Sequence, residues 1–538
     1  MGRKETFALL KFSRKVVKCM DFKPVKKAKK GFHSLVFSRT TILIVLLLAQ
    51  LAIFAATLTY LRDYAQYIYG LFGVLEIVSV VYIINSKSNP AFKITWILLI
   101  FVLPVFGTAF YLFMKMMPGT GLIERRLADL TVSTREYMKQ DEDTLEALPV
   151  SKPANANLAH YLSKQVNFPV HRNTSVKYFS SGEDKFEEMK KQLEKAEKFI
   201  FMEYFIVEEG IMWDEIFEIL KKKVHAGVEV RFMYDGMCSL SKVPHDYDKK
   251  IRKYGIKCKM FSPVRPILSS YQNNRDHRKI CVIDGNVGFT GGINLADEYI
   301  NRIERFGHWK DTAVMLEGEA VQNLTILFLQ MWNVSQKKPE NYLQYLTPKS
   351  LEFKRELGFV LPYGDSPFDK EIIGEQVYFH ILNHAKKYVH IMTPYLILDN
   401  EMLTTLKFAA KCGIEVIIIM PHIPDKWYAF ILAKTYYEEL MEAGVQIYEY
   451  TPGFIHAKVF VSDNDTATVG TINLDYRSLY HHFENGVFIY NNQVVWDIEK
   501  DFQETLVKCE KVSLTNLRSR SLIEQVVGKI LRLVAPLM

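Results

Sequence analysis

Two stretches of the chain carry the same chemically active residues at the same spacing. The first, HRKICVIDGNVGFTGGIN, covers residues 277–294, and the second, HAKVFVSDNDTATVGTIN, covers residues 456–473. Each reads His-x-Lys, four residues, Asp, and later Asn. The members are His277, Lys279, Asp284 and Asn294 in the first stretch, and His456, Lys458, Asp463 and Asn473 in the second. Because side chains alternate along a strand, the His and Lys of each pair are expected on one face.

Two such pairs facing each other could surround one phosphate. The Lys ammonium groups and the Asn amides would neutralise and hydrogen-bond its oxygens. One His could attack the phosphorus while the other protonates the leaving oxygen. An ordinary imidazole, with a pKa of about 6.5, can take either role at neutral pH. A metal centre is not expected, because a Lys beside each His repels a cation.

Positive charge is concentrated at the start of the chain. The net charge is +8 over 538 residues, and the first forty residues hold twelve Lys and Arg against Glu5 and Asp21. The rest is close to neutral, which argues against a nucleic-acid binder. Six scattered Cys without CxxC spacing suggest neither a zinc site nor a disulfide framework.

Three apolar runs follow the basic arm, at residues 41–61, 64–84 and 94–114. The first and third have no charged residue, and each is long enough to cross a bilayer as a helix. The middle run contains Glu76, which is costly in lipid unless it is buried against neighbours. Buried core helices are the alternative, above all for this run.

The remainder alternates helical and strand patterns, and it does so twice. The helical pattern EDKFEEMKKQLEKAEK places Phe186, Met189 and Leu193 on one face, before the buried strand FIFMEYFIV. HAGVEVRFMYD in the first half is echoed by KCGIEVIIIMP in the second. Two whole α/β units therefore each deliver one His-x-Lys motif. Near the end, LIEQVVGKILRLVAPL has an apolar stripe that fits either a membrane surface or a core-packing helix.

The paired His-x-Lys-x4-Asp motif resembles the phospholipase D superfamily, and longer stretches resemble its bacterial cardiolipin synthases. These include YFSSGEDKFEEM, NNRDHRKICVIDGNVGFTGGINLADEY and GTINLDYRSLYHHFENGVF. The resemblance implies two phospholipase D-like α/β sandwich domains in tandem, with an N-terminal transmembrane helical region. The expected organisation is a basic cytoplasmic arm (1–40), a transmembrane region (41–117), a connector (118–170), the two domains (171–340 and 356–512) and an amphipathic C-terminal helix (513–538).

The resemblance also implies roles for single residues. An acid later in its own half should orient each His, giving Asp311 for His277 and Glu484 for His456, while His277 should be the nucleophile. Asp284 and Asp463 belong to the catalytic motif but are expected to tie down turns rather than move protons. The implied reaction needs no cofactor: phosphatidylglycerol donates a phosphatidyl group through a phosphatidyl-His intermediate to a second phosphatidylglycerol, giving cardiolipin and glycerol.

Other readings of the same motifs stay open. Water as acceptor would make the protein a phospholipase D-type hydrolase, and a silent membrane scaffold has no reason to keep both Lys and both His. Expected partners are phosphatidylglycerol and cardiolipin in the cell membrane, with no nucleic acid. The basic arm should stay in the cytoplasm. Three crossings would then place the catalytic part outside the cell, and two crossings would place it inside.

Overall fold

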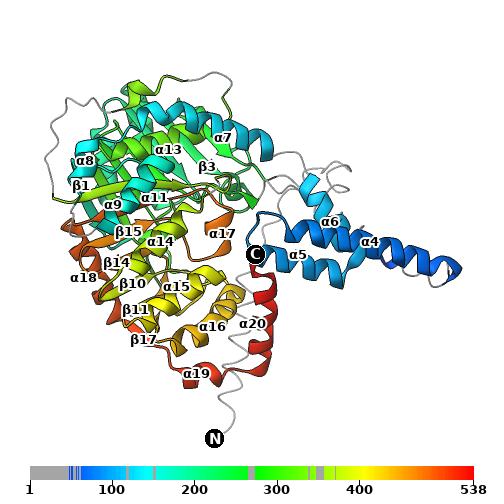
Figure 1. Cartoon of the computed structure of the whole chain (residues 1–538). Helices are drawn as coiled ribbons and strands as arrows, with labels where there is room; N and C mark the ends of the chain where they lie inside the picture. The colour runs from blue at the N-terminus through cyan, green and yellow to red at the C-terminus, as the bar shows by residue number, and fades with distance from the viewer. Residues whose placement is uncertain are drawn as a thin grey trace, which may run out of the picture. The chain divides into compact units, whose positions relative to one another are not determined.

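The computed structural model describes residues 62–116, 120–148, 153–264, 273–336, 340–346, 357–369 and 371–537, with residues 48, 50–52, 56 and 59. It divides into two compact units, residues 1–69 with 265–268, and residues 70–264 with 269–538. In the first unit, the described part holds the short helix η1 (Arg62–Tyr64) and the start of helix α4 (Ala65–Ile84). The elements from α5 onward belong to the second unit, which carries both motifs (Figure 1).

Two mixed β-sheets with matching strand order form the framework of the second unit. The seven-stranded sheet has the order β1-β8-β6-β5-β2-β3-β4, and the eight-stranded sheet has β9-β16-β15-β14-β10-β11-β12-β17. The strands of the first half are β1 (Thr174–Phe179), β2 (Phe199–Tyr204), β3 (Glu229–Asp235), β4 (Lys257–Phe261), β5 (Lys279–Ile283), β6 (Val287–Gly291), β7 (His308–Lys310) and β8 (Ala313–Gly318). Those of the second half are β9 (Phe359–Asp365), β10 (Tyr388–Met392), β11 (Glu415–Pro421), β12 (Gln446–Tyr450), β13 (Gly453–Ile455), β14 (Val459–Ser462), β15 (Thr466–Gly470), β16 (Glu484–Tyr490) and β17 (Cys509–Lys511). The predicted tandem repeat of α/β units is confirmed, since both sheets follow one topology and β17 is the addition.

Helices cover the outer faces of the sheets. In the first half these are α10 (Gly182–Lys195), α11 (Ile211–His225) and α12 (Tyr247–Arg252); in the second they are α14 (Ile373–His384), α15 (Asn400–Lys411) and α16 (Trp427–Glu442). Helix α10 begins where the Ser181 hydroxyl accepts a hydrogen bond from the Asp184 amide. Its buried face contains Phe186, Met189 and Leu193, as the spacing predicts.

The two halves share a hydrophobic core. One cluster combines side chains of β2 and β5 with side chains of β14, β15 and β16, and with helices α13 (Val321–Asn333) and α18 (Val494–Leu506). Helix α13 is buried along nearly its whole length. Because apolar side chains from both repeats meet here, the halves pack as one body and can place their motifs against each other.

The expected transmembrane region contains helices of a different arrangement. The first run lies mostly outside the described residues, and the second forms α4. The third run was expected to form one helix. It forms two helices that pack against each other, α5 (Pro90–Val102) and α6 (Pro104–Met116). Pro104 cannot continue a helix, and Gly107 lets α6 approach α5 so closely that a Cβ would lie 2.7 Å from the Leu99 oxygen. Among the described residues, no helix combines the length and apolarity that a membrane crossing requires.

The segment expected as a polar connector is largely helical. It contains α7 (Thr120–Thr134), the short helices η2 (Arg135–Tyr137) and α8 (Glu142–Glu146), then α9 (Pro153–His160) and the π-helical turn η3 (Tyr161–Gln165). Helix α7 packs against α13, and α9 packs against α14. The segment is polar because each helix has one side that faces solvent. Polar composition alone does not distinguish such helices from a loop. The C-terminal region adds α17 (Tyr476–Tyr480), α19 (Leu514–Arg518), α20 (Leu522–Val534) and η8 (Ala535–Leu537).

Candidate active site

Each motif His lies just before a strand, and the opposite half holds its backbone. The His277 amide donates to the Phe483 carbonyl over 2.9 Å, within a parallel bridge between Asp276 and Phe483. In the same way, β13 pairs in parallel with β7, and the His456 amide donates to the Lys310 carbonyl. The residue after each of these carbonyls is an acid of the other half, so the pairing brings that acid beside the His.

The His-orienting acids are consequently exchanged between the halves. His277 Nδ1 lies 2.9 Å from both carboxylate oxygens of Glu484, and His456 Nδ1 lies 2.6 Å from Asp311 Oδ2. The expected pairing within each half, Asp311 with His277 and Glu484 with His456, is therefore wrong. Both carboxylates are fully buried. They fix the imidazole tautomer with hydrogen on Nδ1 and leave each Nε2 as the reactive nitrogen.

The two acids are accommodated in different ways. In the second half, the Thr471 hydroxyl donates to Glu484. At the corresponding position the first half has Gly292, where a Cβ would lie only 2.0 Å from Asp311 Oδ1. Only glycine leaves room for that carboxylate, which also accepts the Thr312 amide over 2.8 Å.

The two motif lysines are buried in the same electrostatic environment. Lys279 and Lys458 are 1% and 2% exposed, and each ammonium donates to the backbone carbonyl of its own motif His. Their charges repel, and both interact with Asp311 and Glu484. The two motif lysines and the two His-orienting acids therefore belong to one site.

Burial dominates the protonation of the site. It lowers the pKa of His277 to about 3, more than neighbouring Glu484 raises it, and it lowers the pKa of His456 well below its usual value, with help from Lys458. Burial also lowers the pKa of Lys279 to about 7 and of Lys458 to about 8, and it raises the pKa of Asp311 to about 6.

Glu484 differs from the other acid. Burial raises the pKa of Glu484, but the interactions with His277 and His482 lower it by more, so that it lies below its usual range. The free site therefore holds two neutral imidazoles, an ionised Glu484 and ammonium groups that are easily deprotonated.

Both motif asparagines are buried. Asn294 Oδ1 accepts the Ile206 amide over 3.0 Å, and Asn294 Nδ2 donates one hydrogen to the Tyr299 hydroxyl over 2.7 Å. Among the described residues, the second hydrogen of that amide nitrogen has no acceptor, so it could be donated to a ligand. Asn473 is 5% exposed, and its Oδ1 makes no hydrogen bond to any described residue.

The motif aspartates lie at the far ends of their strands from the lysines. Asp284 accepts the backbone amides of residues 197, 198 and 199 over 2.7–2.8 Å. Asp463 accepts those of residues 386, 387 and 388 over 2.7–3.2 Å. Each carboxylate thus joins its motif strand to the turn that precedes the neighbouring strand, and neither contacts the imidazoles. This placement agrees with the expected structural role.

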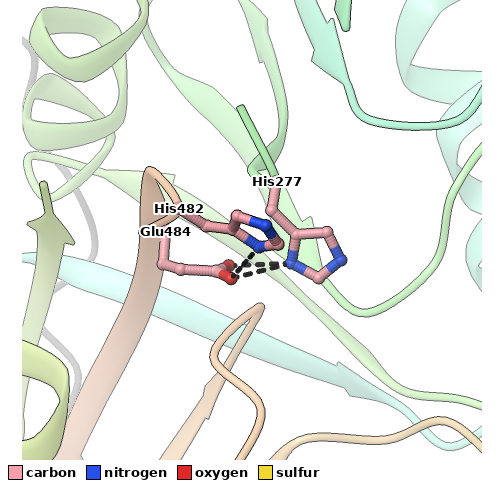
Figure 2. Close-up of side chains that lie close together, drawn as sticks. All are labelled: His277, His482 and Glu484. Carbon is pink, nitrogen blue, oxygen red and sulfur yellow. Dashed lines mark hydrogen bonds and ion pairs between the residues drawn. The ribbon is translucent and has the colours of Figure 1, made fainter. Parts of the chain in front are cut away.

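Sequence reasoning missed a third imidazole. His482 Nδ1 lies 3.6 Å from Glu484 Oε1, and its ring centre lies 5.5 Å from that of His277 (Figure 2). Both ring nitrogens are buried and make no hydrogen bond to the described residues. His482 precedes strand β16, which begins at Glu484, so no spacing within HHFENGV singled it out. Aromatic rings complete the walls: Phe205 against His277, and Tyr299, Trp309 and Phe454 against His456.

Among the described residues, one group has the donor set for a metal ion. Ligand atoms of His277, His482 and Glu484 lie within 4.8 Å of one another. A metal there would displace the hydrogen bond that orients His277 and would sit close to the Lys279 ammonium, which lowers the pKa of that same imidazole. The arrangement is better suited to a phosphate, with an imidazole Nε2 from each half and two ammonium groups for its oxygens.

Comparisons with known proteins identify the family of the chain. The family model described as cardiolipin synthase, PLD-like domain, matches residues 189–332 and 378–506, and that described as phospholipase D-nuclease N-terminal matches residues 74–115. The chain is 35% identical over 472 residues to a cardiolipin synthase of Geobacillus sp. (strain WCH70), covering 86% of this chain and 92% of the relative. It is likewise 35% identical over 483 residues to the cardiolipin synthase of Halalkalibacterium halodurans, covering 88% and 95%.

Two further likenesses add less about chemistry. An uncharacterized protein of Streptococcus mutans serotype c is 53% identical over 460 residues, covering 86% of this chain and 99% of the relative. The crystal structure of phosphatidylserine synthase from Haemophilus influenzae Rd KW20 superposes with a TM-score of 0.56 at 15% identity, covering 72% of this chain and all of that one. At this identity the likeness supports the fold alone.

Proposed function

Because this chain belongs to the cardiolipin synthase family of phospholipase D-type phosphatidyltransferases, we propose that it makes cardiolipin and glycerol from two molecules of phosphatidylglycerol. One observation carries the proposal. Two imidazoles, each oriented through Nδ1 by a buried carboxylate of the opposite half, lie beside two buried lysine side chains. This arrangement suits a double displacement at one phosphodiester.

In the first step, the Nε2 lone pair of one His forms a bond to phosphorus, and the bond from phosphorus to the glycerol oxygen breaks. The second His, which is protonated at Nε2 when substrate is bound, gives its proton to that oxygen, and glycerol leaves. In the second step, the now neutral imidazole removes a proton from the glycerol hydroxyl of a second phosphatidylglycerol. The alkoxide attacks phosphorus, the phosphorus–nitrogen bond breaks, and cardiolipin forms. By family likeness His277 is the nucleophile and His456 the acid and base.

The charge balance supports this sequence. The free site keeps both imidazoles neutral, as a nucleophile requires. A bound phosphodiester brings one negative charge between Lys279 and Lys458, and so favours protonation of the second imidazole at Nε2. The ammonium groups, with the free N–H of Asn294, would hold the phosphate oxygens as charge develops.

The test is a product analysis. Purified protein is incubated with phosphatidylglycerol, and lipid and water-soluble products are separated. Cardiolipin plus glycerol supports the proposal, whereas phosphatidic acid plus glycerol would establish the hydrolase alternative. No turnover in protein that still binds phosphate would favour the scaffold.

Membrane attachment through residues 41–117 and placement of the catalytic domains outside the cell are further parts of the proposal. They are supported by the basic arm and by the apolar runs of the sequence. A reporter fused after Met538 tests the placement. Signal from a reporter that works only in the cytoplasm would overturn it.

A further inference from the structure

The C-terminal helix α20 turns much of its apolar face outward. It lies against α16 (Figure 1). Gly528 allows the close approach, since a Cβ there would lie 2.7 Å from Thr435 Cγ2. On its other side, five apolar side chains are 46–78% exposed: Leu522, Ile523, Val526, Ile530 and Leu533. Their spacing repeats every three or four residues, so they form one stripe along the helix. A helix that only covered the core would bury this stripe.

The stripe continues onto the start of α16. Trp427 is 64% exposed and Tyr428 is 36% exposed. Between α16 and α20 lies an open groove of about 510 Å³, lined by Pro424, Trp427, Phe430, Ile431, Ser521, Ile523, Glu524 and Val527. We call the exposed set the apolar strip; it comprises Trp427, Tyr428, Leu522, Ile523, Val526, Ile530 and Leu533.

One end of the apolar strip adjoins the candidate active site. The loop before Trp427 is held against β13, because the amides of His422 and Ile423 donate to the Gly453 carbonyl over 3.2 and 3.3 Å, and β13 ends directly before His456. Lys426, in the same loop, lowers the pKa of His456 and donates to the Tyr395 hydroxyl over 3.0 Å. Asp425, one residue earlier, interacts with the charge of Lys458. The strip therefore begins at the segment that borders the reacting groups.

The other end meets the apolar helices near the start of the unit. The Thr95 hydroxyl of α5 donates to the Leu533 carbonyl over 3.1 Å, and α5 also contacts η8. Helix α5 exposes Ile94, Phe101 and Val102, each by more than 60%. Apolar surface thus extends from the border of the site, along α20, to α5.

The C-terminal segment that carries the strip is basic, although most of its basic residues are paired with acids. Residues 513–537 contain four basic residues and one acid, a net charge of +3. Arg518 pairs with Glu438 and Glu442 of α16, Arg532 pairs with Glu439 of the same helix, and Arg520 pairs with Glu524. Lys529, which is exposed on α20, is the basic residue of this segment that makes no ion pair with the described residues. A line of apolar side chains with an aromatic end and a basic flank matches the interface of an anionic bilayer.

We propose that the apolar strip docks on the surface of an anionic phospholipid bilayer, with α20 lying in the interface and the border of the active site facing the lipid. The link to the active site rests on the proposed function, while the exposed apolar face and its charge do not. A second copy of this chain is the competing occupant, but the unpaired Lys529 and the exposed rings of Trp427 and Tyr428 favour the interface of an anionic bilayer.

The first test measures whether the side chain of Trp427 enters the bilayer. The full-length protein is placed in phosphatidylglycerol vesicles with brominated acyl chains, which quench tryptophan fluorescence on contact. The quenched signal should fall in Trp427→Phe and stay unchanged in Trp496→Phe, a matched control because Trp496 is 53% exposed on α18, outside the strip. Equal quenching losses, or none, in the two variants would overturn the proposal. This readout needs no activity, so it stands even if the proposed reaction fails.

The second test adds charge to the strip. Val526→Asp with Ile530→Asp should slow turnover of phosphatidylglycerol in vesicles at least about tenfold, because carboxylates oppose insertion. Turnover of a detergent-dispersed short-chain substrate should be unchanged. The control is Val507→Asp, at a side chain that is 87% exposed outside the strip. If the double variant instead converted a dimer to a monomer in detergent and left Trp427 quenching unaltered, the strip would be a contact between copies and the proposal would be wrong.

Discussion

His277 and Glu484 are 207 residues apart, yet they form one hydrogen-bonded pair, as do His456 and Asp311 across 145 residues. Each catalytic unit is therefore assembled from both halves. This exchange has a kinetic consequence, because removing an acid should impair the His of the other half.

A substrate with a good leaving group can separate the two imidazoles. A nitrophenyl phosphodiester of the lipid needs no acid for its first step, so a burst of nitrophenol reports only on the nucleophile. We expect His277→Ala and Glu484→Gln to lose the burst, by about 10²-fold or more, and His456→Ala and Asp311→Asn to retain it. If Asp311→Asn instead behaved like His277→Ala, the exchanged pairing would be refuted; an inverted pattern that keeps the pairs would make His456 the nucleophile.

The buried charges predict a narrow pH range for kcat/KM. A carboxylate with a raised pKa is lost as pH falls through it, so activity should decline below about pH 6 as Asp311 is protonated. An ammonium group with a lowered pKa is lost as pH rises, so activity should decline above pH 7 to 8 as Lys279 and Lys458 deprotonate. Because Arg does not titrate in this range, Lys279→Arg with residual activity should extend the alkaline limb. If the alkaline limb of the pH profile were unchanged in both Lys279→Arg and Lys458→Arg, its assignment to these lysines would be wrong.

We predict that the site needs no metal ion and that His482 makes it sensitive to inhibition by transition metals. We expect chelators to leave turnover of detergent-dispersed substrate unchanged and Zn²⁺ to inhibit it, by joining His277, His482 and Glu484. Even outer-shell partners contribute about 10–100-fold to metal affinity, so His482→Asn should raise the inhibitory Zn²⁺ concentration at least tenfold. His481→Asn, at the neighbouring residue, is the control. Equal inhibition in both variants would exclude the cluster.

At the scale of elements, the same carboxylate device fixes both motif strands. Asp284 and Asp463 occupy left-handed backbone conformations, with φ of 53° and 54°, and each accepts three backbone amides. Asn tolerates this conformation, so Asp→Asn removes the charge and one acceptor but keeps the turn. We expect each variant to lose about 1–3 kcal/mol of unfolding free energy, measured in urea, with activity per folded molecule retained. Asp246→Asn, at an exposed acid whose side chain makes no capping bond, should change neither. If an Asp→Asn variant lost activity while its free energy of unfolding was unchanged, that aspartate would have a role in the reaction instead.

The elements also show how far the sequence could lead. The paired motifs, the repeated α/β order and the buried face of α10 were predictable, because each depends on spacing within one short segment. The exchanged acids were not, since no local pattern specifies that residues 276 and 483 form a parallel bridge. Pro104 indicated the break between α5 and α6, but the prediction of a single helix followed the length of the uninterrupted apolar run instead. His482 was passed over because an imidazole beside another His gives no spacing signal until the strand is known.

At the scale of the whole molecule, the exchange makes the two repeats interdependent. They share the core around α13, and each completes the other's active unit. We therefore expect the two halves of the catalytic unit to unfold in one transition. Inorganic phosphate, bound between Lys279 and Lys458, should stabilise both halves together, by about 2.7 kcal/mol at one hundred times its dissociation constant.

Hydrogen exchange can read this coupling in each half separately. With phosphate, the amides of residues 279–283 and 459–462 should gain protection in parallel, because both strands carry the shared site. In Lys279→Ala the gain should vanish from both strands, including the one that keeps its own lysine. Protection that persisted in the second half alone, or a first half that opened at lower denaturant than the second, would mean that the repeats act as separate domains and that the cross-paired histidines do not depend on each other.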